Sequence, residues 1–280
     1  MFYQIANKFL HNVIFLSVNY VVCKKVDTNS STDSLESRII GGIPVPVESS
    51  PSTAKFYNLG AMCSGSIINS WCVLTAAHCF DHNDVVNDMM IEVGARYIYD
   101  KTGDIYSVLK FVTHKDYNKV MPFACDIALI FVTKEIKLGS KAKKALLADN
   151  QNWMSPAVKD IVVSGWGWTK YGGPISKLGL MRTYLSFVRS EDCEKMHQLT
   201  LSPDMFCLYG AGERDTCKGD SGAGVMWNDM LIGVVSHGDG CAKRDKPSVY
   251  ANVWYFRHWI QTQVEHFFQH ACEMLEARDH

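Results

Sequence analysis

The sequence lacks the patterns that mark several classes of protein. None of its ten cysteines forms a C-x-x-C pair, which excludes the zinc-ribbon and thioredoxin patterns. No apolar run approaches the roughly 18 residues that a membrane-spanning helix needs. The formal net charge is only -1, so no excess of one sign favours nucleic acid or an anionic membrane as a partner. Strands do not alternate with long helical patterns, which argues against a parallel βαβ sheet.

The apolar segments that are present are short and bounded by turn residues, which is typical of an all-β chain. Of the 280 residues, 47% are hydrophobic and 20% are charged, as in an ordinary globular protein. The predicted strands include Gly65–Ile68, Val73–Ala76, Ile91–Val93, Ser107–Thr113, Ile127–Val132, Ile161–Gly165, Gly224–Trp227, Leu231–Ser236 and Ser248–Asn252. Helical spacing of apolar residues predicts one helix from Val253 to about Leu275.

The N-terminal segment has the features of a signal peptide. Lys8 precedes a short apolar run, Val13–Val22, and small residues allow cleavage after Cys23, so residues 1–23 are predicted to be removed. Residues 24–38 are polar and lack periodic hydrophobicity, which favours a linker or pro-segment. Together with the many cysteines, this predicts a secreted, extracellular protein.

Three short segments carry residues suited to nucleophilic catalysis. They are Thr75–Cys79 with His78, Asp126 before an apolar strand, and Ser221 within Gly219-Asp220-Ser221-Gly222. A serine hydroxyl is a weak nucleophile and needs a positioned base, for which histidine has a suitable pKa. A buried carboxylate orients that histidine, and glycines beside the serine let backbone N–H groups reach a developing oxyanion.

In the order His, Asp, Ser, these segments resemble the trypsin-like (chymotrypsin-family) serine proteases. Further matching segments are Arg38-Ile39-Ile40-Gly41-Gly42, Ser164-Gly165-Trp166-Gly167 and Trp259-Ile260, and the resemblance extends from Ile39 to about Phe267. That family is the reference case for Ser–His–Asp catalysis, so the mechanism is carried over from it. The resemblance implies an all-β fold of two packed six-stranded antiparallel β-barrels with a C-terminal helix, in a protease domain at residues 39–280.

The resemblance also implies a role for individual residues. The catalytic residues would be His78, Asp126 and Ser221, with the N–H groups of Gly219 and Ser221 as oxyanion hole. Asp215 would lie at the base of the specificity pocket and select Lys or Arg side chains. Ser236, Gly238 and Ser248 would complete the substrate site.

Activation by cleavage is a further implication of the resemblance. Cleavage after Arg38 by an activating protease would free the amine of Ile39, which would pair with Asp220 and order the site. The expected partners are therefore protein or peptide substrates, the activating protease and protein inhibitors. We expect a monomer that binds neither nucleic acid nor membrane.

The resemblance implies three disulfides, Cys63–Cys79, Cys193–Cys207 and Cys217–Cys241. Cys23 would leave with the signal peptide. Among the remaining cysteines, Cys272 pairs with Cys72 or Cys125, or these two are buried free thiols, and the sequence leaves both possibilities open.

Several positions depart from the family pattern. His237 replaces a tryptophan, Ser64 replaces a glycine, and Gly-Gly-Pro after the nucleophile reads Gly222-Ala223-Gly224. Ser248 replaces a glycine of the pocket wall, where its side chain would intrude and its hydroxyl could bind Asp215.

No cofactor and no metal site are predicted. Ala95-Arg96 lacks the first carboxylate of the family's calcium loop, and Pro247 argues against regulation by sodium. His266, His270 and Cys272 have helical spacing, but a solvated helix end explains them better than a metal site.

Two other functions are considered. A catalytically impaired protease paralogue that acts by binding, as a decoy or inhibitor, is favoured modestly by Ser248 and His237. An α/β-hydrolase esterase would need the order Ser, acid, His and a G-x-S-x-G elbow, so the observed order and Ala223 exclude it.

Overall fold

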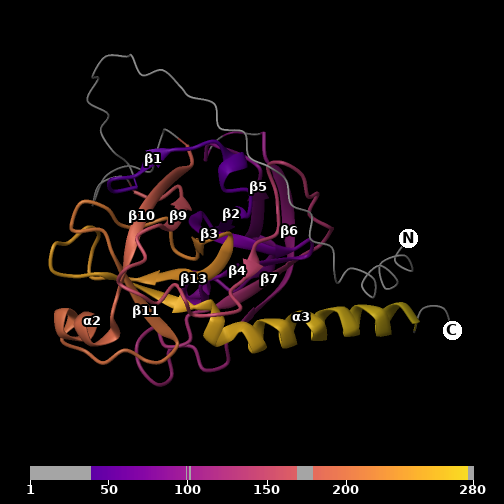
Figure 1. The fold of residues 1–280 in the computed structure, drawn as a ribbon. Helices are drawn as coiled ribbons and strands as arrows, with labels where there is room; N and C mark the ends of the chain where they lie inside the picture. The colour runs from indigo at the N-terminus through magenta and orange to yellow at the C-terminus, as the bar shows by residue number, and fades with distance from the viewer. Residues whose placement is uncertain (1–38, 99, 101, 169–178, 277–280) are drawn as a thin grey trace, which may run out of the picture. The chain divides into compact units, whose positions relative to one another are not determined.

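The computed structural model describes residues 39–98, 100, 102–168 and 179–276, with side chains up to 270. The predicted signal peptide and pro-segment at residues 1–38, Arg38 among them, lie outside the described residues. Two antiparallel β-sheets form the body of the domain, and a long helix follows the last strand (Figure 1). The predicted fold of two six-stranded barrels and a C-terminal helix is confirmed.

The first barrel is a closed ring of strands in the order β2-β3-β4-β7-β6-β5. Its strands are β2 (Thr53–Asn58), β3 (Ala61–Asn69), β4 (Cys72–Thr75), β5 (Met89–Val93), β6 (Asp104–Thr113) and β7 (Ala128–Val132). Strand β7 is apolar and buried throughout, because it pairs with β4 on one edge and β6 on the other. Thr75 of β4 pairs with Ala128 of β7. The chain that leaves β4 therefore lies beside the chain that enters β7.

The second barrel is built from the C-terminal half of the chain. Its strands are β9 (Ile161–Gly165), β10 (Met181–Val188), β11 (Met205–Tyr209), β12 (Gly224–Trp227), β13 (Met230–His237) and β14 (Ser248–Asn252). They follow the order β10-β11-β14-β13-β12-β9, and pairing of β9 with β10 closes the ring. Two short strands extend this sheet, β1 (Ile43–Pro44) beside β10 and β8 (Leu146–Leu147) beside β13.

Two α-helices and three 3₁₀ helices are found in the described residues. They are α2 (Ser190–His197), α3 (Val253–Glu276), η1 (Val47–Ser49), η2 (Ala77–Phe80) and η3 (Val86–Asp88). Asn252, at the end of β14, begins α3, since its side-chain oxygen accepts the N–H groups of Trp254 at 3.1 Å and Tyr255 at 3.4 Å.

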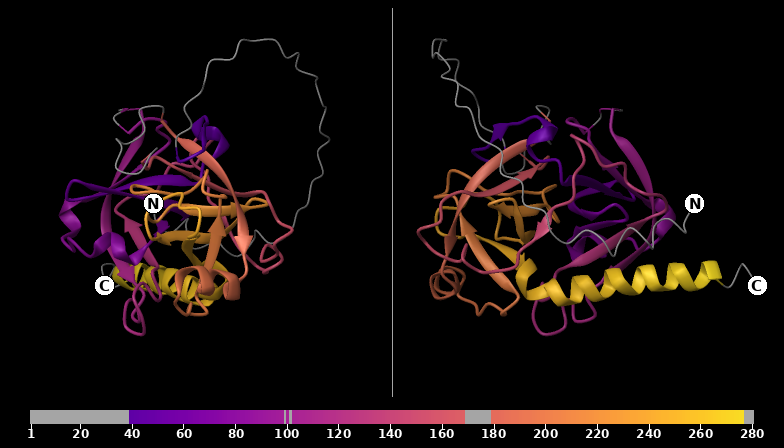
Figure 2. Two further views of the ribbon diagram at one scale, coloured as in Figure 1. Left: turned by 90° about the vertical axis from the view of Figure 1, so that its left-hand side faces the viewer. Right: turned by 45° about the vertical axis from the view of Figure 1, so that its right-hand side comes forward.

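Helix α3 leaves the second barrel and packs against the first (Figures 1 and 2). Phe267 of α3 stacks on Phe131 of β7 with ring centroids 4.2 Å apart. Phe256 and Ile260 are buried in the same core cluster. No helix in the described part of the chain is long and apolar enough to cross a membrane.

A charged side chain is buried in the first barrel. Lys55 of β2 donates from Nζ to Glu92 Oε2 at 3.1 Å and to the Tyr97 carbonyl at 2.6 Å. Burial lowers the pKa of Lys55, and the charge of Glu92 opposes that shift. Tyr97 lies in the loop after Val93-Gly94, where the sequence predicts no calcium site. An ammonium from β2 therefore ties this loop to the barrel.

The cysteines pair as the resemblance implies. Disulfides join Cys63 to Cys79, Cys193 to Cys207 and Cys217 to Cys241. Cys72 and Cys125 carry free thiols, as in one of the two possibilities that the sequence leaves open, but only Cys72 is buried and Cys125 is half-buried. The side chain of Cys272, like Cys23, lies outside the described residues.

Candidate active site

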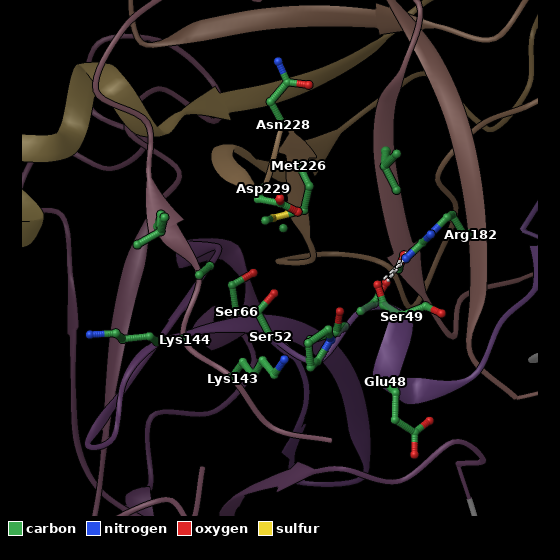
Figure 3. A pocket seen from close by; sticks show the side chains of 18 of the residues that line it. Glu48, Ser49, Ser52, Ser66, Lys143, Lys144, Arg182, Met226, Asn228 and Asp229 are labelled. Atoms are coloured by element: carbon green, nitrogen blue, oxygen red, sulfur yellow. Dashed lines mark hydrogen bonds between the residues drawn. The ribbon is translucent and has the colours of Figure 1, made fainter. Parts of the chain in front are cut away.

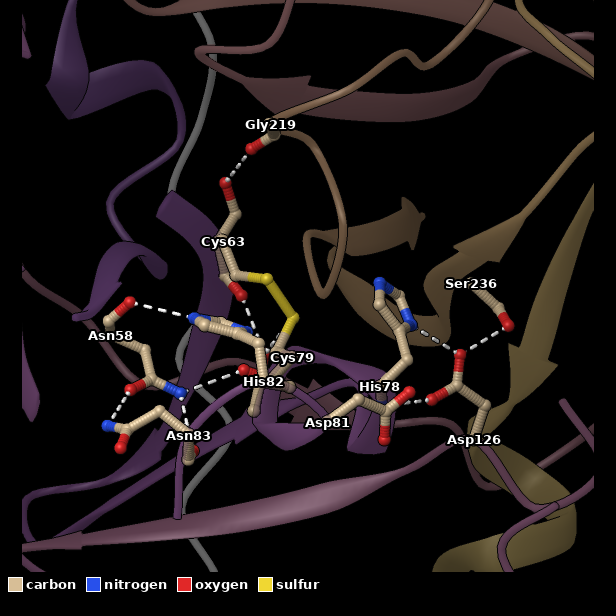
Figure 4. The surroundings of a disulfide bond; sticks show 12 residues. Asn58, Cys63, His78, Cys79, Asp81, His82, Asn83, Asp126, Gly219 and Ser236 are labelled. Carbon is tan, nitrogen blue, oxygen red and sulfur yellow. Dashed lines mark hydrogen bonds and ion pairs between the residues drawn. A yellow bond between two sulfur atoms is a disulfide. The ribbon is translucent and has the colours of Figure 1, made fainter. Parts of the chain in front are cut away.

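His78 and Asp126 are joined by two hydrogen bonds. His78 lies in η2 just after β4, and Asp126 lies just before β7, so the pairing of these strands brings them together. The Nδ1 atom of His78 is 2.8 Å from Asp126 Oδ2, and the backbone N–H of His78 donates to Asp126 Oδ1 at 2.9 Å (Figure 4). The carboxylate therefore sets both the position of the backbone and the orientation of the ring.

The second barrel supplies a third partner for this pair. Ser236 of β13 donates from Oγ to Asp126 Oδ2 at 2.5 Å. Burial tends to raise the pKa of Asp126, but hydrogen bonds from His78 and Ser236 outweigh it and lower the pKa. Burial likewise opposes a charge on His78, yet the Asp126 carboxylate raises the pKa of the imidazole. His78 is thus a strengthened base beside a carboxylate that stays ionised.

Ser221 lies in a tight glycine-rich turn. Gly219 has φ 100° and Gly222 has φ 80°, values that glycine adopts without strain. A Cβ on Gly222 would also lie 2.2 Å from Thr75 Oγ1. Within the described part of the chain, the N–H groups of Gly219 and Ser221 have no protein acceptor. Both are free to donate to a bound oxyanion.

A short path connects this turn to His78. The N–H of Ser64 donates to the Ser221 carbonyl at 2.7 Å, and the neighbouring Cys63 is disulfide-bonded to Cys79, which follows His78. No hydrogen bond joins Ser221 Oγ to His78. Such bonds are often long before substrate binds. The path, and the close approach of Gly222 to Thr75, nevertheless place the turn beside the segment that carries His78.

Ser64 makes a contact that a glycine at this position could not make. Its hydroxyl donates to the Gly219 carbonyl at 3.2 Å. Together with the Ser64 N–H bond to Ser221, this contact holds the turn on both sides of Asp220.

Asp215 is a buried carboxylate that already has three hydrogen-bond donors. They are Ser248 Oγ at 2.7 Å, the Ala242 N–H at 2.7 Å and the Thr216 N–H at 2.8 Å. Burial raises the pKa of Asp215, and these bonds oppose the shift. The direct Ser248–Asp215 bond, one of the contacts that the sequence allows for this hydroxyl, is therefore present. A Cβ on Gly238 would lie 3.1 Å from Ser248 Oγ, so these two residues face each other.

Asp220 is a fully buried carboxylate without a cationic partner in the described structure. It accepts the N–H groups of Gly167 at 2.8 Å and Cys217 at 2.9 Å. Burial raises its pKa to about 7. A Cβ on Gly165 or Gly167 would lie within 2.3 Å of its carboxylate oxygens, so this motif needs glycine at both positions. Ile39 is also fully buried.

One group of metal-ligating side chains lies close together in the described part of the chain: Cys63, His78 and Cys79. Both cysteines are in a disulfide and offer no thiolate, so the group does not suit a metal. A cavity of about 740 Å³ opens elsewhere, and its lining includes Ser66, Lys143 and Arg182 (Figure 3). No residue predicted for catalysis or for the specificity pocket lines this cavity.

The family model described as Trypsin matches residues 39–260, which is most of the chain. The chain belongs to the trypsin family of serine proteases. It is a serine endopeptidase, and its substrates are proteins or peptides.

Similar proteins include trypsins from several animals. The chain is 33% identical to "Trypsin epsilon" of Drosophila erecta over 81% of this chain and 88% of that protein. It is 32% identical to "Hypodermin-B" of Hypoderma lineatum, over 83% and 90%. Among solved structures it is similar to neuropsin, a serine protease expressed in the limbic system of mouse brain. That match has 27% identity and a TM-score of 0.71, and it covers 80% of this chain and 98% of that one.

Two residues of this trypsin-family site are missed by sequence reasoning. Phe123 stacks on His237 with ring centroids 4.4 Å apart, and its ring lies nearly perpendicular to that of His78 with centroids 6.0 Å apart. Asn58 holds the histidine turn, because its side-chain amide donates to the Cys79 carbonyl at 3.0 Å. The one available signal for Phe123 is its place three residues before Asp126 in the chain.

Proposed function

We propose that this trypsin-family protein is a secreted zymogen that, once cleaved after Arg38, hydrolyses peptide bonds following Lys or Arg. The observation that carries the proposal is the pair of hydrogen bonds between His78 and Asp126, together with the hydrogen bond that Ser236 of the other barrel donates to Asp126. That arrangement suits general-base catalysis and has little structural purpose otherwise.

In the proposed reaction, Ser221 Oγ attacks the substrate carbonyl carbon while His78 Nε2 takes the hydroxyl proton. The N–H groups of Gly219 and Ser221 bind the oxyanion that forms. His78 then gives the proton to the leaving amine, the peptide bond breaks, and an acyl-enzyme remains. A water molecule repeats the same steps, releasing the acid and restoring Ser221.

The preference for basic side chains rests on Asp215. A buried carboxylate is most stable beside a cation, which a Lys or Arg side chain would supply. Gly238 leaves space on one wall, whereas the Ser248 hydroxyl already satisfies part of the carboxylate. We therefore propose cleavage after Lys or Arg at a reduced rate, with Lys favoured because Arg needs room for its planar fork.

Activation rests on Asp220 and Ile39. A buried carboxylate with a raised pKa and no cation is suited to receive the new ammonium of Ile39. The proposal includes an activating protease, protein inhibitors as partners, a monomeric state and removal of residues 1–23 on secretion.

The test is replacement of the proposed nucleophile and base after activation. Ser221→Ala and His78→Ala should each lower kcat by several orders of magnitude, and the double variant should be little worse than either. A serine-directed fluorophosphonate should label the activated wild type at Ser221 and leave Ser221→Ala unlabelled. Near-normal turnover by either variant would show that the assignment is wrong.

A further inference from the structure

His237 is linked to the proposed catalytic carboxylate of Asp126 by two successive hydrogen bonds, with Ser236 between them. It is the last residue of β13 and directly follows Ser236, which donates to Asp126. The Nδ1 atom of His237 is 3.0 Å from Ser236 Oγ. The tryptophan that the family pattern has at this position offers no ring nitrogen in that place.

The direction of this bond follows from counting protons. Ser236 has one hydroxyl proton, and the 2.5 Å contact with the Asp126 carboxylate uses it. The hydroxyl can then only accept from His237, so His237 carries its proton on Nδ1. The bonds form one chain in which His237 donates to Ser236 and Ser236 donates to Asp126.

The imidazole ring of His237 also packs against Phe123. It lies almost parallel to the Phe123 ring, at 13° and 4.4 Å, and the Phe123 ring is in turn nearly perpendicular to that of His78. Burial lowers the pKa of His237 to about 4, which keeps the ring neutral in the neutral pH range. The titratable groups that face it are Asp126, His78, His197 and Asp204.

We propose that His237 is a positioning residue that acts on the catalytic pair through Ser236, by donating from Nδ1 and fixing the direction of the Ser236 hydroxyl. The proposal rests on the proposed function. A hydroxyl that accepts a hydrogen bond is a stronger donor, because hydrogen bonds in a chain polarise one another. The Asp126 carboxylate is then better stabilised, and the pKa of His78 is held lower than it would be without His237.

Two variants separate the hydrogen bond from the packing. His237→Phe keeps an aromatic ring against Phe123 and removes the donor, whereas His237→Asn keeps a donor near the Nδ1 position and removes the ring. After activation, His237→Phe should lower kcat by about 2- to 10-fold, the usual value of one hydrogen bond. It should also move the acid limb of the kcat/KM profile to higher pH by a few tenths of a unit. His237→Asn should restore the acid limb and most of the lost kcat while raising KM.

A double variant tests the route through Ser236. If His237 acts through that hydroxyl, adding His237→Phe to Ser236→Ala should cost no further kcat. Additive losses, an acid limb that His237→Phe does not move, or failure of His237→Asn to restore it would each overturn the proposal. Should His237→Phe not fold, His237→Gln serves instead, since its amide reaches the Nε2 position and leaves the Nδ1 position without a donor. Fluorophosphonate labelling of the wild type is measured first, because absent labelling would contradict the proposed function and not this inference.

Discussion

In the proposed specificity pocket, the hydrogen bond between Ser248 and Asp215 would reduce the gain in free energy when a basic side chain enters. The hydrogen bond between them occupies one Asp215 oxygen before any substrate binds. A hydrogen bond to a charged group contributes about 1.5–3 kcal/mol, which is comparable with the discrimination that such a pocket achieves. This single hydroxyl can therefore change both the rate and the order of preference.

Replacing Ser248 with glycine should raise kcat/KM on both Lys and Arg substrates, by about tenfold and more for Arg. The physical reason is that Asp215 loses a competing donor and the wall opposite Gly238 opens. The measurement is kcat/KM on paired peptides that differ only in the residue before the scissile bond. Ser248→Ala is the matched control, since it removes the hydroxyl but keeps a methyl group.

Two results would change the assignment. A preference of the activated protein for Phe or Leu would remove Asp215 from its proposed role. No cleavage by the native chain, with activity restored in Ser248→Gly, would favour the impaired paralogue.

Site residues that belong to short motifs are predictable from the sequence, whereas individual side-chain hydrogen bonds are not. His78, Asp126 and Ser221 each stand in a recognisable segment. The bonds from Ser64 to Gly219 and from His237 to Ser236 depend on tertiary packing and on a side-chain rotamer, which no local pattern specifies.

At the scale of elements, patterned strands are predictable and the shortest ones are not. The predicted strand at Ile127–Val132 becomes β7 at Ala128–Val132, and the helix predicted from Val253 to Leu275 becomes α3. Strands β1 and β8 have two residues each, too few for any periodicity, and they form only because a neighbouring edge is free to pair.

Lys55 holds the loop after β5. The stability of the domain should therefore not depend on a divalent cation bound in that loop. A chelator should leave the denaturation midpoint of the native chain unchanged. Lys55→Met should lower the free energy of unfolding by about 3–5 kcal/mol, because it leaves the buried Glu92 carboxylate without its cation. Urea denaturation followed by tryptophan fluorescence measures both effects.

The matched control is Lys119→Met, which removes an exposed lysine 4.0 Å from Asp116 and should change stability by less than about 0.5 kcal/mol. A lower midpoint in the presence of chelator would contradict the prediction and indicate a bound cation.

At the scale of the whole molecule, cleavage after Arg38 should change how stability depends on pH. In the uncleaved chain the pKa of Asp220 is raised to about 7, so the native state holds a proton that the unfolded chain releases near pH 4. The contribution of Asp220 to the free energy of unfolding is therefore lost as pH rises from about 4 through 7. If the new Ile39 ammonium pairs with Asp220 as proposed, it compensates the ionised carboxylate, so the gain in stability on cleavage should grow from pH 5 to pH 7.5.

Comparing cleaved and uncleaved Ser221→Ala protein by urea denaturation at several pH values measures this gain without autolysis. Carbamylation of the new amine is the matched control and should abolish it. A gain that is equal at pH 5 and pH 7.5 would exclude Asp220 as the partner.

The contact of α3 with the first barrel has a consequence for biosynthesis. The strands of that barrel are complete once Val132 has been made, but Phe131 receives its partner Phe267 only after α3 has been made. During translation, the apolar face of the first barrel that α3 later covers therefore stays exposed while more than a hundred further residues are added. Domains usually fold in the order of synthesis, and a face that stays open is a natural place for a chaperone to bind. The first barrel therefore reaches its finished form only after the second barrel and α3 have been synthesised.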